Sequence, residues 1–339
     1  MMPEKSVDSN RIFISVIVTA HDRREFIMKA LASIMRQTLS RDRYEVIVVK
    51  NYKDDEVDRY IEFNNYKSIV TNAVRVGKKL SMAINISKGN VITILEDDDE
   101  YNESRLQAVY ETFMNIGETV YFENMQAYID QNGNTISRFN RLKNEEDIRI
   151  ENNGITTEEY LQMLKEPAGN VSCMAISKKI LVDHLEDLSK IMRSPDTFIL
   201  FLGFSHSNFV VRDRRKLTKQ RIHVSATKLP DNLTRNVYLR EKYYRGKSSY
   251  DDWNVIINLT IGTNVYRIAT LLLNHRKFLY LMYSQDRKAV IDSLKYIVKL
   301  TGFVGIKTET LNLLAWAMHL FSPSFFITVA YLHYRLSLN

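Results

Sequence analysis

Residues 91–102 read VITILEDDDEYN, an apolar run followed by five consecutive acids: Glu96, Asp97, Asp98 and Asp99, then Glu100 before Tyr101. The apolar run predicts a buried β-strand. Four like charges repel one another, and a solvated turn needs only one or two acids. Because all four lie at the tip of an apolar strand, the stretch predicts a site for a cation.

Alternating strand and helix patterns surround this stretch. Apolar runs predict strands at residues 13–20, 44–50, 67–73 and 90–95, and helical spacing predicts helices at residues 21–38, 54–63 and 77–89. Asp22 and Glu25 resemble a capping box at the start of the first helix. Such alternation is typical of an α/β fold with a mostly parallel sheet, where ligands bind at the carboxyl ends of the strands. The acids and the segment around His21 both follow strands, so we expect them to share one site.

The net charge of +7 is confined to the last third of the chain. Residues 231–339 hold 14 Lys and Arg against 7 Asp and Glu, so the first 230 residues are neutral. The same third contains the longest apolar runs. The sequence therefore predicts an α/β domain at residues 1–230 and a basic, apolar helical region at residues 231–339. A region that is both basic and apolar favours a membrane surface as partner and argues against nucleic acid.

Two apolar stretches of the C-terminal region approach the length of a membrane span. Residues 253–274 carry one charged side chain, Arg267, and residues 310–334 carry no Asp, Glu, Lys or Arg. A charge at the centre of a bilayer is costly, and a Ser-Pro-Ser interrupts the second stretch. We predict a bundle of helices in the interface of an anionic membrane. Spanning helices, or a soluble helical appendage that forms a homodimer, are the alternatives.

The amino-terminal residues and the cysteine content predict the compartment. The first ten residues are polar and contain no apolar core, so we expect no signal peptide. A single cysteine, Cys173, excludes an internal disulfide framework and fits a reducing environment. We therefore expect a cytoplasmic protein on the inner face of the cell membrane.

Residues 14–38, 44–58 and 77–106 together resemble the nucleotide-sugar domain of family 2 glycosyltransferases. The resemblance is strong over the first 110 residues and continues in weaker pieces to Asn232. It implies the GT-A fold, which is a Rossmann-like, mostly parallel sheet flanked by helices. It also implies a nucleotide-diphosphate sugar donor and a divalent cation, Mn²⁺ or Mg²⁺, held by an Asp-x-Asp motif.

The resemblance assigns the four acids to a metal site. Glu96-Asp97-Asp98 is the Asp-x-Asp-like triplet, with Glu in place of the first Asp. Asp98 would bind the metal, Glu96 or Asp97 would bind the ribose or a metal-bound water, and Asp99 would support them. His223 would complete the metal shell or donate to phosphate. The alternatives are a solvated acidic turn and an ordinary strand histidine.

Other matching positions are implied to bind the nucleotide sugar. The family's motif around an aromatic-Asn-Arg appears here as Val18 to Arg23, and the family's usual Asp at the end of the second strand is Lys50. Asp54 and Asp55 follow Lys50 and could take over that contact to base or ribose. Lys78 and Lys79 open a helix and suit an anion, although solvated lysines are the alternative. The implied contacts are Thr19, His21, Asp22, Arg23, Asp54, Asp55, Lys78, Lys79, Asp97 and Arg221.

An inverting transfer needs a general base that accepts the proton of the acceptor hydroxyl. In the family this is an acid ahead of an apolar stretch, and RSPDTFILF (193–201) nominates Asp196. The alternative role for Asp196 is to cap a helix that starts at Thr197. Asp183, Glu186 and Asp187 are rivals in a less suitable context.

These observations predict a metal-dependent, inverting glycosyltransferase that moves a sugar from a nucleotide-diphosphate donor to a glycan or lipid-linked acceptor. A sugar-phosphate nucleotidyltransferase is one alternative, but it needs a Gly-rich loop after the first strand, and VTAHDRRE (18–25) contains no Gly. A non-catalytic module that binds a nucleotide sugar or a partner is the other alternative.

Overall fold

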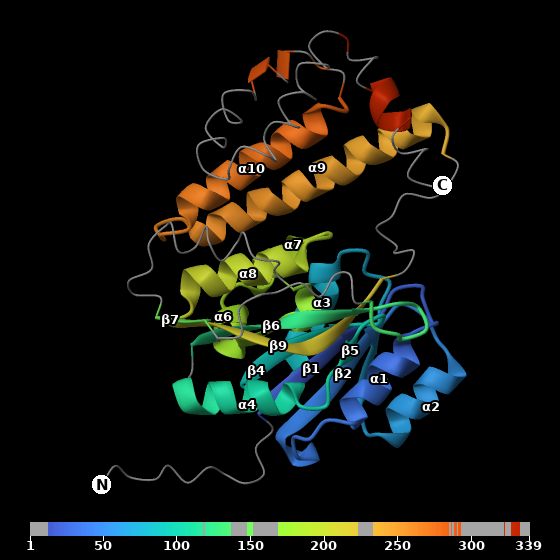
Figure 1. The fold of residues 1–339 in the computed structure, drawn as a ribbon, viewed down its shortest axis with the longest axis vertical. Helices are drawn as coiled ribbons and strands as arrows, with labels where there is room; N and C mark the ends of the chain where they lie inside the picture. The colour runs from blue at the N-terminus through green and yellow to red at the C-terminus, as the bar shows by residue number, and fades with distance from the viewer. Residues whose placement is uncertain are drawn as a thin grey trace. The chain divides into compact units, whose positions relative to one another are not determined.

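The computed structural model in Figure 1 describes most of the chain as two compact units. Its described residues are 13–117, 119–136, 148–151, 169–222, 233–284, 286, 288–289, 291–292, 322 and 327–332. The first unit contains the described residues up to 222, and the second contains those from 233 onward.

A single mixed sheet forms the centre of the first unit. Its order is β3-β2-β1-β4-β8-β6-β9-β5, with β7 beside β9. The strands are β1 (Ile14–Thr19), β2 (Tyr44–Lys50), β3 (Lys67–Val70), β4 (Val91–Glu96), β5 (Glu100–Tyr101), β6 (Val120–Ile129), β7 (Ile148–Glu151), β8 (Met174–Ser177) and β9 (Phe209–Arg221). The first four strands are parallel, and β8 pairs antiparallel with both β4 and β6. The parallel half places the ends of β1 and β4 side by side.

Helices cover both faces of this sheet (Figure 1). On one face lie α1 (Ile27–Met35), α2 (Asp55–Phe63) and α4 (Arg105–Ile116); on the other lie α3 (Val76–Ile86), α6 (Lys178–Val182), α7 (Leu185–Lys190) and α8 (Pro195–His206). Val16 and Val18 of β1 pack with Leu31 of α1 in one buried core. Ile17, between them, is also fully buried, as expected for a strand covered on both faces. The predicted α/β fold is confirmed.

Two predicted helix boundaries are wrong by a few residues. The first helix begins at Ile27, with Phe26 as its N-cap, and Asp22 does not cap it. Asp22 instead has a φ of 61° and pairs with Asn51, which keeps the segment after β1 out of the helix. The third helix ends at Ile86, because Ser87 is already extended.

Gly77 allows α3 to contact α7 closely. Its N–H donates to the carbonyl of Ile191 at 3.0 Å. A Cβ at this position would lie 1.8 Å from the carbonyl oxygen of Leu188, a backbone atom that no rotamer change can move away. Only glycine therefore fits without displacing one of the two helices.

We expect Gly77→Ala to destabilise the protein by about 1–3 kcal/mol, because α7 must shift to admit the methyl group. The measurement is the free energy of unfolding from urea denaturation. Lys78→Ala, at the exposed neighbouring position, is the control and should change that free energy by less than about 0.5 kcal/mol. Equal stabilities of the two variants would contradict the close contact.

The second unit contains α9 (Arg235–Thr260) and α10 (Tyr266–Leu281), which pack side by side. Residues 327–332 are helical and join the same core. The Tyr331 hydroxyl donates to the carbonyl of Leu233 at 2.7 Å, and the Tyr238 hydroxyl donates to that of Ala330 at 3.2 Å. These tyrosines thus connect residues 327–332 to the start of α9, in agreement with the predicted helical region.

The apolar stretch at residues 253–274 is divided between these two helices. Residues 261–265 form the connection, and Gly262 has a φ of 80° there. The alternative of one spanning helix over this stretch is therefore wrong. Across the described part of the chain, no helix is both long enough and apolar enough to span a bilayer. Most of the second stretch, 310–334, lies outside the described residues.

Candidate active site

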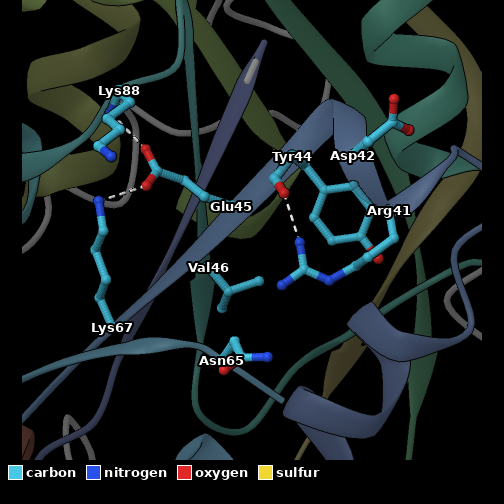
Figure 2. A pocket seen from close by; sticks show the side chains of 8 residues that line it. All are labelled: Arg41, Asp42, Tyr44, Glu45, Val46, Asn65, Lys67 and Lys88. Atoms are coloured by element: carbon cyan, nitrogen blue, oxygen red, sulfur yellow. Dashed lines mark hydrogen bonds and ion pairs between the residues drawn. The ribbon is translucent and has the colours of Figure 1, made fainter. Parts of the chain in front are cut away.

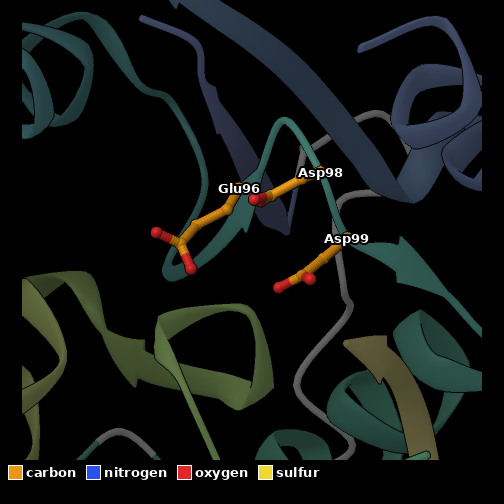
Figure 3. A group of neighbouring side chains, drawn as sticks. All are labelled: Glu96, Asp98 and Asp99. Carbon is orange, nitrogen blue, oxygen red and sulfur yellow. The ribbon is translucent and has the colours of Figure 1, made fainter. Parts of the chain in front are cut away.

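The acidic turn, defined here as residues 96–99, lies between β4 and β5. The carboxylates of Glu96, Asp98 and Asp99 are directed toward the same side of the turn (Figure 3), and each offers an oxygen within 4.8 Å of the others. The Asp97 N–H donates to the carbonyl of Thr19, the last residue of β1, at 3.2 Å. Two neighbouring parallel strands therefore hold the acids at their carboxyl ends, as predicted.

Two residues next to β8 support the turn. The Asn170 side chain donates to Glu96 Oε2 at 2.9 Å and to Asp99 Oδ2 at 2.5 Å. The Ser172 hydroxyl accepts from the Glu96 N–H at 3.0 Å. Donation from one amide group holds two of the repelling carboxylates side by side. Sequence reasoning missed both residues, because GNVS carries no local motif and only the antiparallel pairing of β8 with β4 brings it to the acids.

Arg221 lies behind the acidic turn and its side chain is fully buried. Its Nε donates to the carbonyl of Asp98 at 2.9 Å, and its Nη2 contacts Glu100. Its Nη1 donates to the carbonyls of Asp130 and Gln131, at 2.8 and 3.1 Å. The guanidinium therefore clamps the turn to the end of β6. The expected contact to phosphate is not available to Arg221 in this arrangement.

Burial and mutual repulsion raise the pKa values of the acidic turn. Desolvation raises the pKa of Asp97 to about 7, against the attraction of Arg23. Burial, followed by the charge of Asp98, raises the pKa of Asp99 to about 6. Burial, then Asp99 and Asp98, raise the pKa of Glu96 well above its ordinary value. Gathering these acids without a cation is electrostatically unfavourable, which is the property expected of a cation site.

These shifts predict that the metal-free protein loses stability as the pH rises. Asp97 and Asp99 bind protons more tightly in the folded chain than at their ordinary pKa of 3.8. Their stabilising contribution is therefore complete below that value and is lost as the pH passes through about 6 to 7. We expect the free energy of unfolding, measured in EDTA, to be lower by about 1–3 kcal/mol at neutral pH than in mild acid.

Asp97→Asn removes one of the groups whose pKa is raised and should reduce this difference. Asp42→Asn is the matched control, because Asp42 is exposed and its pKa is lowered by the Ser40 hydroxyl. A difference that Asp97→Asn leaves at the wild-type size would contradict the role of the acidic turn.

Arg23 binds two of the acids at once. Its Nη2 donates to Asp97 Oδ1 and its Nη1 donates to Asp98 Oδ2, each at 2.7 Å. The other oxygen of Asp97, Oδ2, is buried and has no hydrogen-bond partner among the described residues. Arg23 therefore supplies a positive charge directly at the carboxylate predicted to bind the metal.

His21 and Asp22 lie just beyond the carboxyl end of β1. Asp22 accepts a hydrogen bond from Asn51 Nδ2 at 2.6 Å, and its N–H donates to Asn51 Oδ1 at 2.9 Å. His21 is half exposed, and its Nε2 lies 3.6 Å from Asp22 Oδ2. This reciprocal pair joins the ends of β1 and β2, so both strands contribute to the same edge. Asn51 was not predicted, because the sequence drew attention to the charged residues around it.

The two predicted lysines of α3 differ in their surroundings. Lys79 is buried, and its Nζ lies 2.8 Å from His21 Nδ1 and 3.4 Å from the carbonyl of Ala20. Burial lowers the pKa of Lys79, opposed by the charges of Asp22 and Asp97. Lys78 is exposed on the helix surface. The structure thus brings Lys79, and not the Lys78 side chain, to the predicted site.

The residues after β2 are engaged in holding α2. Lys50 is fully buried and pairs with Asp58 Oδ1 at 2.7 Å. Asp54 is the N-cap of α2 and accepts from the N–H groups of Glu56 and Val57, both at 3.1 Å. Asp55 is exposed in the first turn of the helix. Asp54 therefore has a structural role, and neither aspartate contacts the acidic turn.

Asp196 lies in the first turn of α8, in electrostatic reach of the acidic turn. Its charge contributes to the raised pKa of Glu96, after burial and the two nearer aspartates. The helix begins at Pro195 with Ser194 as its N-cap, so Asp196 is not the cap of a helix starting at Thr197. Its rivals Glu186 and Asp187 are paired with Lys190 on α7.

The remaining predicted residue, His223, lies outside the described residues. Asp183, the third rival for the general base, is exposed at the end of α6. The predicted site residues that the structure gathers at one edge are Thr19, His21, Asp22, Arg23, Lys79, Glu96, Asp97, Asp98, Asp99 and Asp196.

A cavity of about 360 Å³ opens at the opposite edge of the sheet, where β2 and β3 begin (Figure 2). Glu45 accepts from Lys67 Nζ at 2.7 Å and from the N–H of Lys88. Arg41 donates to the carbonyl of Tyr44 at 2.5 Å. The side chains of Arg41 and Lys67 thus have acceptors within the cavity wall, and none of the lining residues belongs to the acidic turn.

Comparison with known families gives the class of the protein. The family model described as Glycosyl transferase family 2 matches residues 15–185, half of the chain. The chain therefore belongs to this family and is a glycosyltransferase. The match includes β1 to β4, the acidic turn and β8. A comparison with curated proteins found no match.

Solved structures of S. aureus TarS are similar in fold. The crystal structure of TarS 1–349 in complex with UDP has a TM-score of 0.53 at 12% identity, covering 78% of this chain and 70% of that chain. A second TarS crystal structure has a TM-score of 0.56 at 12% identity, covering 84% and 49%. The complex of TarS 1–349 with UDP-GlcNAc has a TM-score of 0.50 at 11% identity, covering 86% and 91%. This likeness confirms the predicted GT-A fold.

Proposed function

We propose that the chain is a metal-dependent, inverting glycosyltransferase that transfers a sugar from a nucleotide-diphosphate donor to a hydroxyl of a glycan or lipid-linked acceptor. The observation that carries the proposal is the gathering of Glu96, Asp98 and Asp99 at the carboxyl ends of parallel strands, with Asp196 in electrostatic reach. The solved TarS complexes contain UDP and UDP-GlcNAc, which supports a uridine diphosphate sugar as the donor to test first.

The donor atoms of the acidic turn fit a hard divalent cation. All three candidate ligands are carboxylates, and Mg²⁺ and Mn²⁺ prefer oxygen ligands. One oxygen of each carboxylate lies within 4.8 Å of the others, so the three residues could hold one cation together. Asp98, with Glu96 and Asp99, would hold the cation. When bound, it would stabilise the negative charge that the leaving diphosphate acquires.

The protein's own groups account for the remaining chemistry. The acceptor hydroxyl attacks the anomeric carbon as the bond to the diphosphate breaks, so the oxygen–carbon bond forms on the face opposite the leaving group. The hydroxyl proton passes to the carboxylate of Asp196, which acts as general base. Lys79 and His21 line the end of β1, where the donor would bind, and the buried Lys79 would add positive charge near the diphosphate.

A thermal-shift screen of nucleoside diphosphates, each with and without Mn²⁺, tests the donor and the metal together. A ligand that binds only the folded protein raises the melting temperature by mass action, and no acceptor is needed. We expect UDP with Mn²⁺ to give a larger rise than UDP or Mn²⁺ alone. No rise with any nucleoside diphosphate would refute the proposed donor class.

Two alternative functions can be separated from the proposed one. A sugar-phosphate nucleotidyltransferase disagrees with membership of glycosyl transferase family 2. A non-catalytic module would bind the nucleotide in the thermal-shift screen, but it would release no nucleotide from a sugar donor. Release assays with a panel of nucleotide sugars therefore separate the enzyme from the module.

We also propose that residues 231–339 associate with an anionic membrane surface on the cytoplasmic side. The whole net charge of the chain belongs to this region, and Tyr244, Ile261 and Tyr266 of its described part are exposed. Lys and Arg attract acidic head groups while such apolar side chains enter the interface. Sedimentation of the full chain with anionic vesicles, but not with neutral vesicles, is the expected result. The proposal would be refuted if the protein did not bind anionic vesicles and stayed monodisperse without detergent. If that monodisperse species were a dimer, the homodimer alternative would be favoured.

A further inference from the structure

Arg23 occupies the place of a cation at the acidic turn. Its guanidinium bridges Asp97 and Asp98 through two 2.7 Å contacts, and the Asp98 side chain is only 15% exposed. Asp98 is also the residue proposed to bind the divalent cation. One carboxylate thus has two competing cationic partners, one built into the chain and one from solution.

The competition follows from charge. A divalent cation that approaches Asp98 meets the positive charge of Arg23 at the same carboxylate, and the partial burial of the pair reduces screening by water. Arg23 donates to both acids, at Asp97 Oδ1 and Asp98 Oδ2, and its positive charge offsets their negative charges. In the absence of donor, Arg23 therefore weakens the binding of a cation to Asp98.

The surroundings of Arg23 allow its side chain to move. It lies between β1 and α1, in a segment that is neither helix nor strand, and it follows Asp22 with its φ of 61°. The side chain is 30% exposed. A guanidinium matches a phosphate group as well as a carboxylate, through two parallel hydrogen bonds. Arg23 can therefore exchange its carboxylate partners for a diphosphate without disturbing α1.

We propose that Arg23 is an exchangeable counter-cation that couples the binding of the divalent cation to the binding of the donor. Without donor it pairs with Asp97 and Asp98; when the diphosphate binds, Arg23 turns to it and leaves Asp98 to the metal. The inference rests on the proposed function, because it requires a metal at Asp98 and a diphosphate beside it. Coupling of this kind is reciprocal, so each ligand strengthens the binding of the other.

The experiment measures Mn²⁺ binding to the full chain by electron paramagnetic resonance of free Mn²⁺, with and without UDP. Wild-type protein should bind Mn²⁺ weakly alone and more tightly with UDP. Arg23→Gln should bind Mn²⁺ alone about tenfold more tightly than wild type, and UDP should raise the Mn²⁺ affinity of this variant by a smaller factor than that of wild type. Arg24→Gln is the matched control: Arg24 pairs with Asp54 at 3.8 Å and lies over the Tyr52 ring. It should behave as wild type.

Arg23→Lys provides the second variant, because it keeps the charge. It should bind Mn²⁺ alone as weakly as wild type, and thermal unfolding will show that each variant is folded. Equal Mn²⁺ affinities of wild type and Arg23→Gln without UDP would overturn the counter-cation, provided that wild type binds Mn²⁺ with UDP. A gain in Arg23→Lys as large as in Arg23→Gln would overturn it too. Absence of Mn²⁺ binding in every protein, even with UDP, would instead refute the metal site and with it the inference.

Discussion

Asp98→Ala is expected to lower the rate of sugar transfer by about 10³-fold or more, because the loss of several kcal/mol of charge stabilisation on the leaving diphosphate raises the activation free energy by that amount. The measurement is nucleotide release from a panel of nucleotide-diphosphate sugars in the presence of Mn²⁺. Asp98→Asn, which keeps the shape of the side chain and removes its charge, should lose nearly as much. Similar losses of rate in the two variants would assign the loss to the missing charge and not to the cavity left by a smaller side chain.

Asp42→Ala is the control for this prediction. Asp42 is exposed in the 3-10 turn Arg41–Arg43, at the opposite edge of the sheet, and its loss should leave the rate unchanged. A wild-type rate in Asp98→Ala would contradict the metal site, whichever acid serves as the base. Mn²⁺ binding to the same variant, measured with UDP, should also be lost.

Asp196→Asn is expected to lower the rate of transfer by about 10²–10⁴-fold, the range seen when a general base is removed. The stabilisation by UDP with Mn²⁺ in a thermal-shift assay should stay at the wild-type value, because Asp196 is proposed to contact the acceptor and not the nucleotide. Loss of rate with retained donor binding is the signature that separates the base from a metal ligand.

Asp187→Asn tests the rival in the same assay. Asp187 pairs with Lys190 at 2.9 Å on the surface of α7, so its replacement should leave transfer intact. If Asp187→Asn abolished transfer while Asp196→Asn did not, the assignment of the base would be reversed. Both variants replace a partly buried acid by its amide, which keeps their effects on folding comparable.

The parallel half of the sheet could be predicted because its signals are local. The runs of residues 14–19 and 44–50 are apolar enough to identify strands buried on both faces, and Asp54 directly precedes the first turn of α2. The start of α1 was misplaced because Asp22 and Glu25 imitate a capping box. The competing contact, from Asp22 to Asn51, joins residues that are 29 positions apart.

The candidate site, like the fold, could be predicted only where its signals are local in the sequence. Five consecutive acids after an apolar run, the first four of which form the acidic turn, identify this part of the site without any structure. The supports of that turn, Asn170 and Ser172, are uncharged and more than seventy positions away, so no pattern around Glu96 points to them. Arg221 was correctly associated with the turn, but its charge alone could not show that its guanidinium donates hydrogen bonds to protein carbonyls.

The burial of Lys50 links the end of β2 to the stability of α2. Its ammonium group pairs with Asp58 of α2 and donates to the carbonyl of Tyr52. Exchanging it for an acid would set two carboxylates against each other at the foot of α2. A chain with an acid at this position would therefore need a change of Asp58 as well, because the single substitution alone would destabilise the protein.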